Sequence, residues 1–159
     1  TNGPGKVVKT GSGTIIGKTI AQSTSTDSAF VHLDYGYSMD RYSRASTGQS
    51  HMYSKVDSSV AYVGATLIIN SINGHMQSQI TTLNKYVSYH NDGYDYSVKD
   101  AIGINKPLVS GTSGAAALQY YDGKYNVVGI AISTSVSSGT ISKARNINNA
   151  LGITYAPAP

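Results

Sequence analysis

Apolar residues recur along this chain in short runs, which Gly, Asn and Ser interrupt about every eight to twelve residues. Several runs alternate between apolar and polar positions. In "QSQITTL", for example, Ile80 falls on the opposite face from Gln79 and Thr81. This spacing is typical of an all-β sandwich or barrel. The pattern predicts strands at residues 13–20, 29–33, 65–69, 77–83, 85–90, 96–102, 115–121 and 126–134.

Turns and one helix complete the predicted elements. The "DG" at positions 122–123 and the "NDG" at 91–93 predict hairpin turns, because glycine accepts the positive φ that tight turns need. In "ISKARNINNALG", apolar residues fall at helical spacing and Gly152 is well placed to end a helix, which predicts a short helix near residues 142–151. Residues 35–59 show no periodicity and are predicted to form a long loop or linker.

Composition narrows the class of protein. The chain has 159 residues, of which 40% are hydrophobic and only 13% charged, so we expect a real core under a surface rich in hydroxyls and amides. The sequence contains no Cys, which excludes a disulfide framework and a thiolate metal site. No pair of histidines has the spacing typical of a metal site, and neither a metal nor any other cofactor is expected.

Charge and hydropathy exclude two further classes. The net charge of +4 comes from scattered Lys and Arg without a basic run, so a nucleic-acid partner is not expected. No apolar run is long enough to predict a membrane span. The opening "TNGPGK" resembles the start of a mature, processed chain, and the closing "APAP" resembles a linker. Together with the Cys-free, hydroxyl-rich composition, this predicts an extracellular or cell-surface protein.

The candidate chemistry centres on Gly111-Thr112-Ser113-Gly114. A serine nucleophile needs an accessible Oγ, a neighbouring base, and backbone N–H donors aimed at the developing oxyanion. Glycines beside the serine allow a sharp turn and let backbone amides approach a substrate carbonyl. The motif alone is weak, because G-x-S-G arises by chance in a chain this rich in Gly and Ser.

The sequence that follows strengthens the motif. The stretch "LVSGTSGAAALQYYDGKYNVVGIAIS" resembles the chymotrypsin-like serine peptidases, especially their secreted bacterial branch, in which a nucleophile turn precedes a strand, a short turn and a cleft strand. The resemblance implies that Ser113 is the nucleophile and that the amides of Gly111 and Ser113 form the oxyanion hole. It also implies that the cleft strand binds substrate through Ile130, Ala131, Ile132 and Ser133.

The resemblance extends along most of the chain. "SINGHMQSQITTLN" is similar to the hairpin that opens the family's second barrel, and "ISKARNINNALGITY" to its final helix and strand. "TDSAFVHLD" resembles the family's D-x-x-x-V-x-L stretch, which would make Asp27 the catalytic aspartate that orients the base. The implied fold is all-β, with antiparallel chymotrypsin-like barrels: residues 1–60 form a partial first barrel and irregular linker, residues 61–155 a largely complete second barrel with the helix, and residues 156–159 a tail.

Two departures from the family pattern matter. Thr112 and Ala115-Ala116 replace the usual Asp, Gly and Pro around the serine; simpler single-chain members of the family manage without that Asp. More seriously, the family's catalytic histidine precedes the aspartate, and none of the 26 residues before Asp27 is a histidine. The sequence favours ordinary surface positions for the four histidines that are present: His32, His51, His75 and His90.

Three functions remain open. The first is a serine endopeptidase chain that acts on protein or peptide substrates and whose His-bearing segment was cleaved off, staying bound or being lost. The second is a non-catalytic extracellular assembly protein on the same fold, which self-associates through exposed sheet edges. A third, weaker reading is a sugar-binding module that uses the tyrosines at 94, 96, 120 and 121.

The resemblance also implies where a substrate side chain would lie. The walls of the pocket would be residues 105–110, 130–134 and 135–140, none of which contains a carboxylate. A pocket that selects Arg or Lys side chains is therefore not expected. The substrate side chains that such a pocket could accept are therefore small, apolar or acidic ones.

Overall fold

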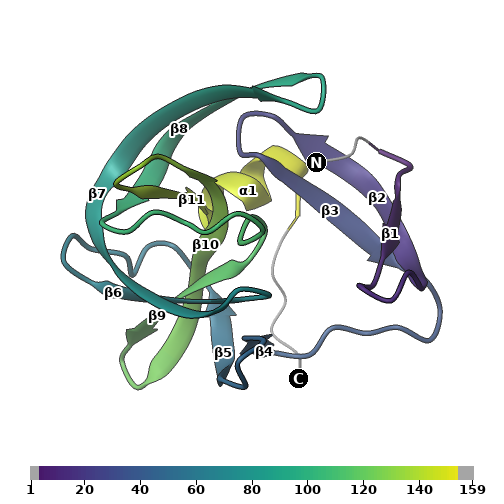
Figure 1. Cartoon of the computed structure of the whole chain (residues 1–159), viewed down its shortest axis with the longest axis horizontal. Coiled ribbons are helices and arrows are strands. Elements are labelled where there is room, and N and C mark those ends of the chain that lie inside the picture. Colours follow the sequence, from purple (N-terminus) through teal and green to yellow (C-terminus); the bar gives the residue numbers. More distant parts are fainter. Residues whose placement is uncertain (1–3, 154–159) are drawn as a thin grey trace.

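A computed structural model describes residues 4–153 as a mostly antiparallel β-structure with one short helix (Figure 1). A three-stranded sheet lies beside a larger barrel. The elements are β1 (Val7–Lys9), β2 (Ile15–Ser23), β3 (Ser28–Leu33), β4 (Tyr42–Arg44), β5 (Ser50–Val56), β6 (Thr66–Ser71), β7 (Gly74–Asn91), β8 (Tyr94–Ile104), β9 (Ala116–Tyr121), β10 (Lys124–Thr134), β11 (Gly139–Lys143) and α1 (Ala144–Leu151).

The barrel consists of six strands that close on themselves. Its order is β11-β8-β7-β6-β9-β10, and β10 pairs back onto β11. Alternate side chains of these strands point inward and form the main core, which includes Leu67, Ile80, Ile102, Val128 and Ile141, each no more than 1% exposed. The predicted all-β fold, with a largely complete second barrel, a partial first barrel and a short C-terminal helix, is confirmed.

Some elements differ from the sequence-based expectation. Residues 77–83 and 85–90, predicted as two strands, belong to the single strand β7, because the irregular pairing near Asn84 is a bulge rather than a break. Residues 35–59 were expected to be irregular, but they contain β4 and β5, and β5 pairs in parallel with β10. The hairpin turns at 91–93 and 122–123 are confirmed, with Asp92, Gly93, Asp122 and Gly123 all at positive φ.

The three-stranded sheet β1-β2-β3 contrasts with the barrel in what it buries. No apolar side chain between residues 4 and 44 is among the buried residues of the core, whereas Val7, Ile15, Ile20 and Phe30 are 38–52% exposed. Among the described residues, α1 lies against β2 and β3, and two hydrogen bonds join the β2–β3 turn to the barrel. The Ser97 amide of β8 donates to the Thr24 carbonyl at 3.2 Å, and the Tyr89 hydroxyl of β7 donates to Asp27. Where the sheet meets β7 and β8, it is therefore attached through polar groups.

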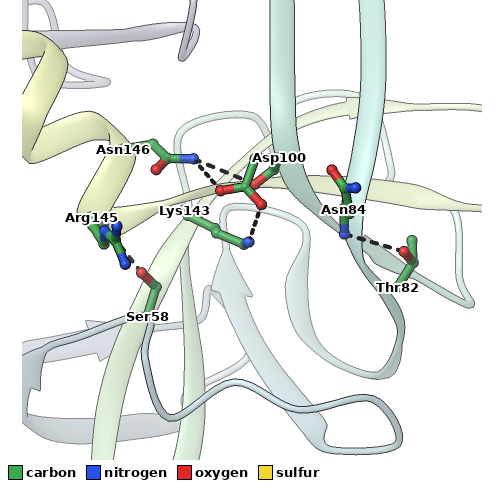
Figure 2. A network of polar contacts seen from close by, with 7 residues as sticks. All are labelled: Ser58, Thr82, Asn84, Asp100, Lys143, Arg145 and Asn146. Carbon is green, nitrogen blue, oxygen red and sulfur yellow. Dashed lines mark hydrogen bonds and ion pairs between the residues drawn. The ribbon is translucent and has the colours of Figure 1, made fainter.

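The helix α1 is fixed to the barrel by the carboxylate of Asp100 (Figure 2). Lys143 Nζ donates to Asp100 Oδ1 at 2.5 Å and Asn146 Nδ2 donates to Oδ2 at 3.1 Å. The hydrogen bond from Lys143 is the main reason that the pKa of Asp100 lies below its usual range. On the other side of the helix start, the Arg145 amide donates to Ser58 Oγ at 3.3 Å.

A second polar cluster joins β4 and β5 to the barrel. The buried Asn70 of β6 donates through Nδ2 to the Ser43 carbonyl at 2.8 Å and to His51 Nδ1 at 3.0 Å, and its Oδ1 lies 2.9 Å from His75 Nδ1. Because a carbonyl can only accept, the bond to Ser43 fixes the orientation of the amide. His51 Nδ1 must then accept and is unprotonated, while His75 Nδ1 donates.

This cluster predicts that acid destabilises the fold. Burial, with the neighbouring His75, lowers the pKa of His51, so the unfolded chain binds a proton more readily than the folded one. The stabilising contribution of neutral His51 should be present above about pH 6.5 and be lost as the pH falls below that value. Urea unfolding followed between pH 7.5 and pH 5 measures it.

Two matched variants separate the contribution of His51 to the pH dependence of stability from that of the other titrating groups. In H51Q, the loss of stability between pH 7.5 and pH 5 should be smaller than in the original chain. In H32Q, which alters an exposed histidine of β3, the loss should be unchanged. Equal pH profiles for all three chains would contradict the assignment to His51.

Candidate active site

Ser113 lies on a tight turn between β8 and β9, with its side chain exposed. Glycines with φ of +89° and +87° stand on either side, at positions 111 and 114, a conformation that residues with a Cβ rarely adopt. The turn is joined to β10, because the Gly114 amide donates to the Ala131 carbonyl at 2.8 Å and Ser113 Oγ lies 3.5 Å from the Ile132 carbonyl. The nucleophile candidate is thus held against the predicted cleft strand.

The backbone amides at this turn divide into two groups. Those of Thr112, Gly114 and Ala115 donate to carbonyls of the protein. Within residues 4–153, neither the Gly111 amide nor the Ser113 amide donates a hydrogen bond. Two donors at an exposed, glycine-rich turn are therefore available to an oxyanion, as the mechanism of a serine nucleophile requires.

Asn73, in the turn between β6 and β7, also holds the nucleophile turn. Its Nδ2 donates to the Ser110 carbonyl at 2.8 Å and to Thr112 Oγ1 at 3.1 Å. Thr112 is only 3% exposed, so the residue that replaces the family's Asp is a buried hydrogen-bond acceptor. Sequence reasoning missed Asn73, because the contact joins positions far apart in the chain and no local pattern marks it.

The predicted substrate strand has a bulge at its centre. Pairing between β10 and β11 joins Ala131 to Ile141 and Ser133 to Thr140, and the register shifts at Ile132 between them. The backbone of Ala131 exchanges hydrogen bonds with Gly114 and Ala115, so this residue supports the nucleophile turn. The three other predicted substrate-binding residues, Ile130, Ile132 and Ser133, lie beside it on the same strand.

Asp27 lies in the turn between β2 and β3, with a positive φ of 45°. Its carboxylate accepts a hydrogen bond from the hydroxyl of Tyr89, whose ring stacks on Tyr96 with centroids 5.2 Å apart. Burial, with the hydrogen bond to Asp27, raises the pKa of Tyr89 and keeps this hydroxyl a donor. Asp27 is therefore attached to the long β7–β8 hairpin, whereas Ser113 is attached to β10.

The four histidines all lie on strands. His51 and His75 stack on each other beside Asn70, with centroids 5.5 Å apart, and exposed His90 is 2.7 Å from Asp95. His32 is exposed on β3. In the part of the chain that the structure describes, no histidine hydrogen-bonds Ser113. Over the same residues, no three His, Asp or Glu side chains gather as a metal site would require, and no helix is long and apolar enough to cross a membrane.

The contact between Asn73 and Thr112 predicts a double-mutant coupling. N73A and T112V should each destabilise the protein by about 1 kcal/mol, because each leaves a hydrogen-bonding group of the pair unmatched. The double variant should lose less than the sum of the two, as expected for residues in direct contact. Urea unfolding of the four chains measures this. Strict additivity would contradict the role of Asn73 in holding the turn.

The chain was compared with known proteins by sequence and by structure. The sequence matches no protein-family model and no curated protein. Among solved structures, the chain is similar to the chymotrypsin of Cellulomonas bogoriensis, with a TM-score of 0.72 and 19% identity over 89% of this chain and 76% of that one. It is also similar to protease A of Thermobifida fusca, with a TM-score of 0.75 and 13% identity over 99% of this chain and 81% of that one.

A third similar structure is a glutamic acid-specific serine protease, described as using a histidine triad in substrate binding. Its TM-score is 0.72, with 19% identity over 92% of this chain and 77% of that one. At these identities the likeness concerns the fold, and it agrees with the resemblance found in the sequence. The chain has the fold of the bacterial chymotrypsin-like serine proteases.

Proposed function

We propose that this chain is the nucleophile-bearing part of an extracellular serine endopeptidase, and that its general-base histidine comes from a segment outside these 159 residues. The observation that carries the proposal is the turn at Ser113. An exposed hydroxyl lies between two glycines at positive φ, beside two amides without a partner among the described residues, and against the strand that would bind substrate.

The proposed chemistry is acyl transfer through Ser113. An imidazole removes the Oγ proton while Oγ attacks the scissile carbonyl, and the amides of Gly111 and Ser113 stabilise the oxyanion. The imidazolium then protonates the leaving amine, and water releases the acyl group by the same steps in reverse. Asp27 would orient the imidazole and stabilise its charge, with its carboxylate held in turn by the Tyr89 hydroxyl.

The three-stranded sheet β1-β2-β3 supports the proposal that the general-base histidine comes from a segment outside these residues. The chain covers 76–81% of the three similar proteases, so about a fifth to a quarter of each has no counterpart here. The sheet β1-β2-β3 keeps Val7, Ile15, Ile20 and Phe30 exposed, as expected of a barrel that lacks some of its strands. A β-segment that packed on this sheet would cover those side chains, and under the proposal it would also bring the imidazole to Asp27 in the β2–β3 turn.

Labelling with a fluorophosphonate tests the proposal. Ser113 Oγ attacks phosphorus and fluoride leaves, while a base takes the Oγ proton. Without a base in the chain, labelling should be slow. Added imidazole should accelerate it by a factor of about 100, the lower end of general-base catalysis. Peptide mapping by mass spectrometry would locate the label.

Two variants serve as controls. S113A should remove the label, and S12A, which alters an exposed serine in the turn between β1 and β2, should retain it. Rapid labelling of Ser113 without imidazole would contradict an external base. Labelling that imidazole does not change, or that S113A retains, would contradict the role of Ser113.

A second candidate function is assembly, which the exposed apolar side chains of the first sheet favour. In that case two copies would cover each other's sheets. The chain should then elute as a dimer or larger species whose size depends on concentration, measured by size-exclusion chromatography with light scattering. I20K should return it to a monomer. V136K, at a fully exposed apolar residue in the loop between β10 and β11, should not. A monomer at all concentrations would contradict this function.

A further inference from the structure

Lys85 reaches from β7 to the loop between β10 and β11, one of the three predicted walls of the substrate pocket. Its Nζ donates to Ser138 Oγ and to the Gly139 carbonyl, each at 3.1 Å. The resemblance places the pocket walls at residues 105–110, 130–134 and 135–140, so it gives no reason to include a residue of β7. The structure therefore joins to a predicted pocket wall a cation that the sequence did not assign to it.

Lys85 is a partly buried cation that has no carboxylate partner among the described residues. Its side chain passes over Gly103, where an added Cβ would lie 3.2 Å from Lys85 Cδ. Within residues 4–153, the two acceptors on Ser138 and Gly139 are its only hydrogen-bond partners, and no Asp forms an ion pair with it. Burial lowers the pKa of Lys85, with no opposite charge nearby to raise it.

The three predicted walls contact one another, and this cation is bonded to the third of them. The Leu108 amide of the first wall donates to Thr134 Oγ1 of the second at 2.9 Å. Gly139 of the third wall packs so closely on Leu108 that an added Cβ would lie 2.9 Å from its Cγ. The hydroxyls of Ser135 and Ser138, 2.9 Å apart, brace the loop that connects the second and third walls. Ile132, which Ser113 Oγ contacts, is two residues before Thr134 on the same strand.

We propose that Lys85 determines substrate specificity, by receiving the acidic side chain of the substrate residue that Ser113 would acylate. The inference rests on the proposed function and narrows its substrate class. An ammonium has three N–H donors, and Ser138 and Gly139 accept from two of them, which leaves one for a carboxylate. A carboxylate would supply the missing counter-charge, whereas a basic side chain would meet an uncompensated cation.

Binding of product-like peptides tests this without catalysis. The probes are acetyl-Ala-Ala-Xaa peptides with a free C-terminal carboxylate, in which Xaa is Glu, Asp, Ala or Lys. Because all four share that carboxylate, differences between them report the side chain alone. Affinity is measured by NMR titration of the labelled chain, and shifts of the Gly111 and Ser113 amides identify binding at the site. The Glu or Asp peptide should bind about tenfold more tightly than the Ala peptide, and the Lys peptide most weakly.

Variants assign any preference to Lys85. K85M should bind the Ala peptide as before and lose the preference for acid, while K85R should retain it. The matched control K99M, at an exposed lysine of β8 outside the walls, should also retain it. Urea unfolding of K85M would confirm that the loop contact is not needed for folding.

The outcomes separate the two proposals. Equal binding of the four peptides, or an acidic preference that K85M retains, would overturn the role of Lys85 and leave the labelling of Ser113 as the test of the proposed function. If none of the peptides shifts the Gly111 and Ser113 amides, the substrate cleft itself would be excluded and both proposals would fall.

Discussion

The backbone pairing of β10 is the constraint on which the rest of this structure depends. This strand pairs with β9 along one edge and with β11 along the other, which closes the barrel, and near its start it also pairs with β5. Gly129 makes the closure possible, because a Cβ at this position would lie 2.0 Å from the Ser142 carbonyl. The Ser113 turn is bonded to the same strand at Ala131, so the candidate site inherits its geometry from the barrel closure.

The two parts of the molecule are stabilised by different interactions. The barrel buries many large aliphatic side chains completely, each of which contributes about 1.5–3 kcal/mol. The three-stranded sheet contributes no buried apolar side chain to that core, so its position depends on the contact of β2 and β3 with α1 and on the bonds from Ser97 and Tyr89. We infer that the sheet opens at a lower free energy than the barrel, since local stability follows buried apolar contacts.

The sequence predicts the elements whose signal lies in neighbouring residues. Alternation located most barrel strands, and glycine-containing turns located two hairpins, because both signals depend on neighbouring residues. It missed β5, which runs parallel to β10 and in which half-buried and exposed residues do not alternate strictly. Asn73 and Lys85 were missed for another reason. Each acts across more than 35 positions, and only the folded barrel brings its partners within hydrogen-bond distance.

Asp27 is a residue for which the sequence pattern and the folded structure indicate different roles. The family pattern in the sequence marks it as a catalytic carboxylate, while the structure shows it bonded to Tyr89 at the end of the β7–β8 hairpin. That bond joins the weakly buried sheet to the barrel, so Asp27 has a structural role that holds whether the chain is a peptidase or an assembly protein. A segment that brought an imidazole to Asp27 would therefore meet a carboxylate already held in place, and this preorganisation would reduce the free energy needed to assemble the site.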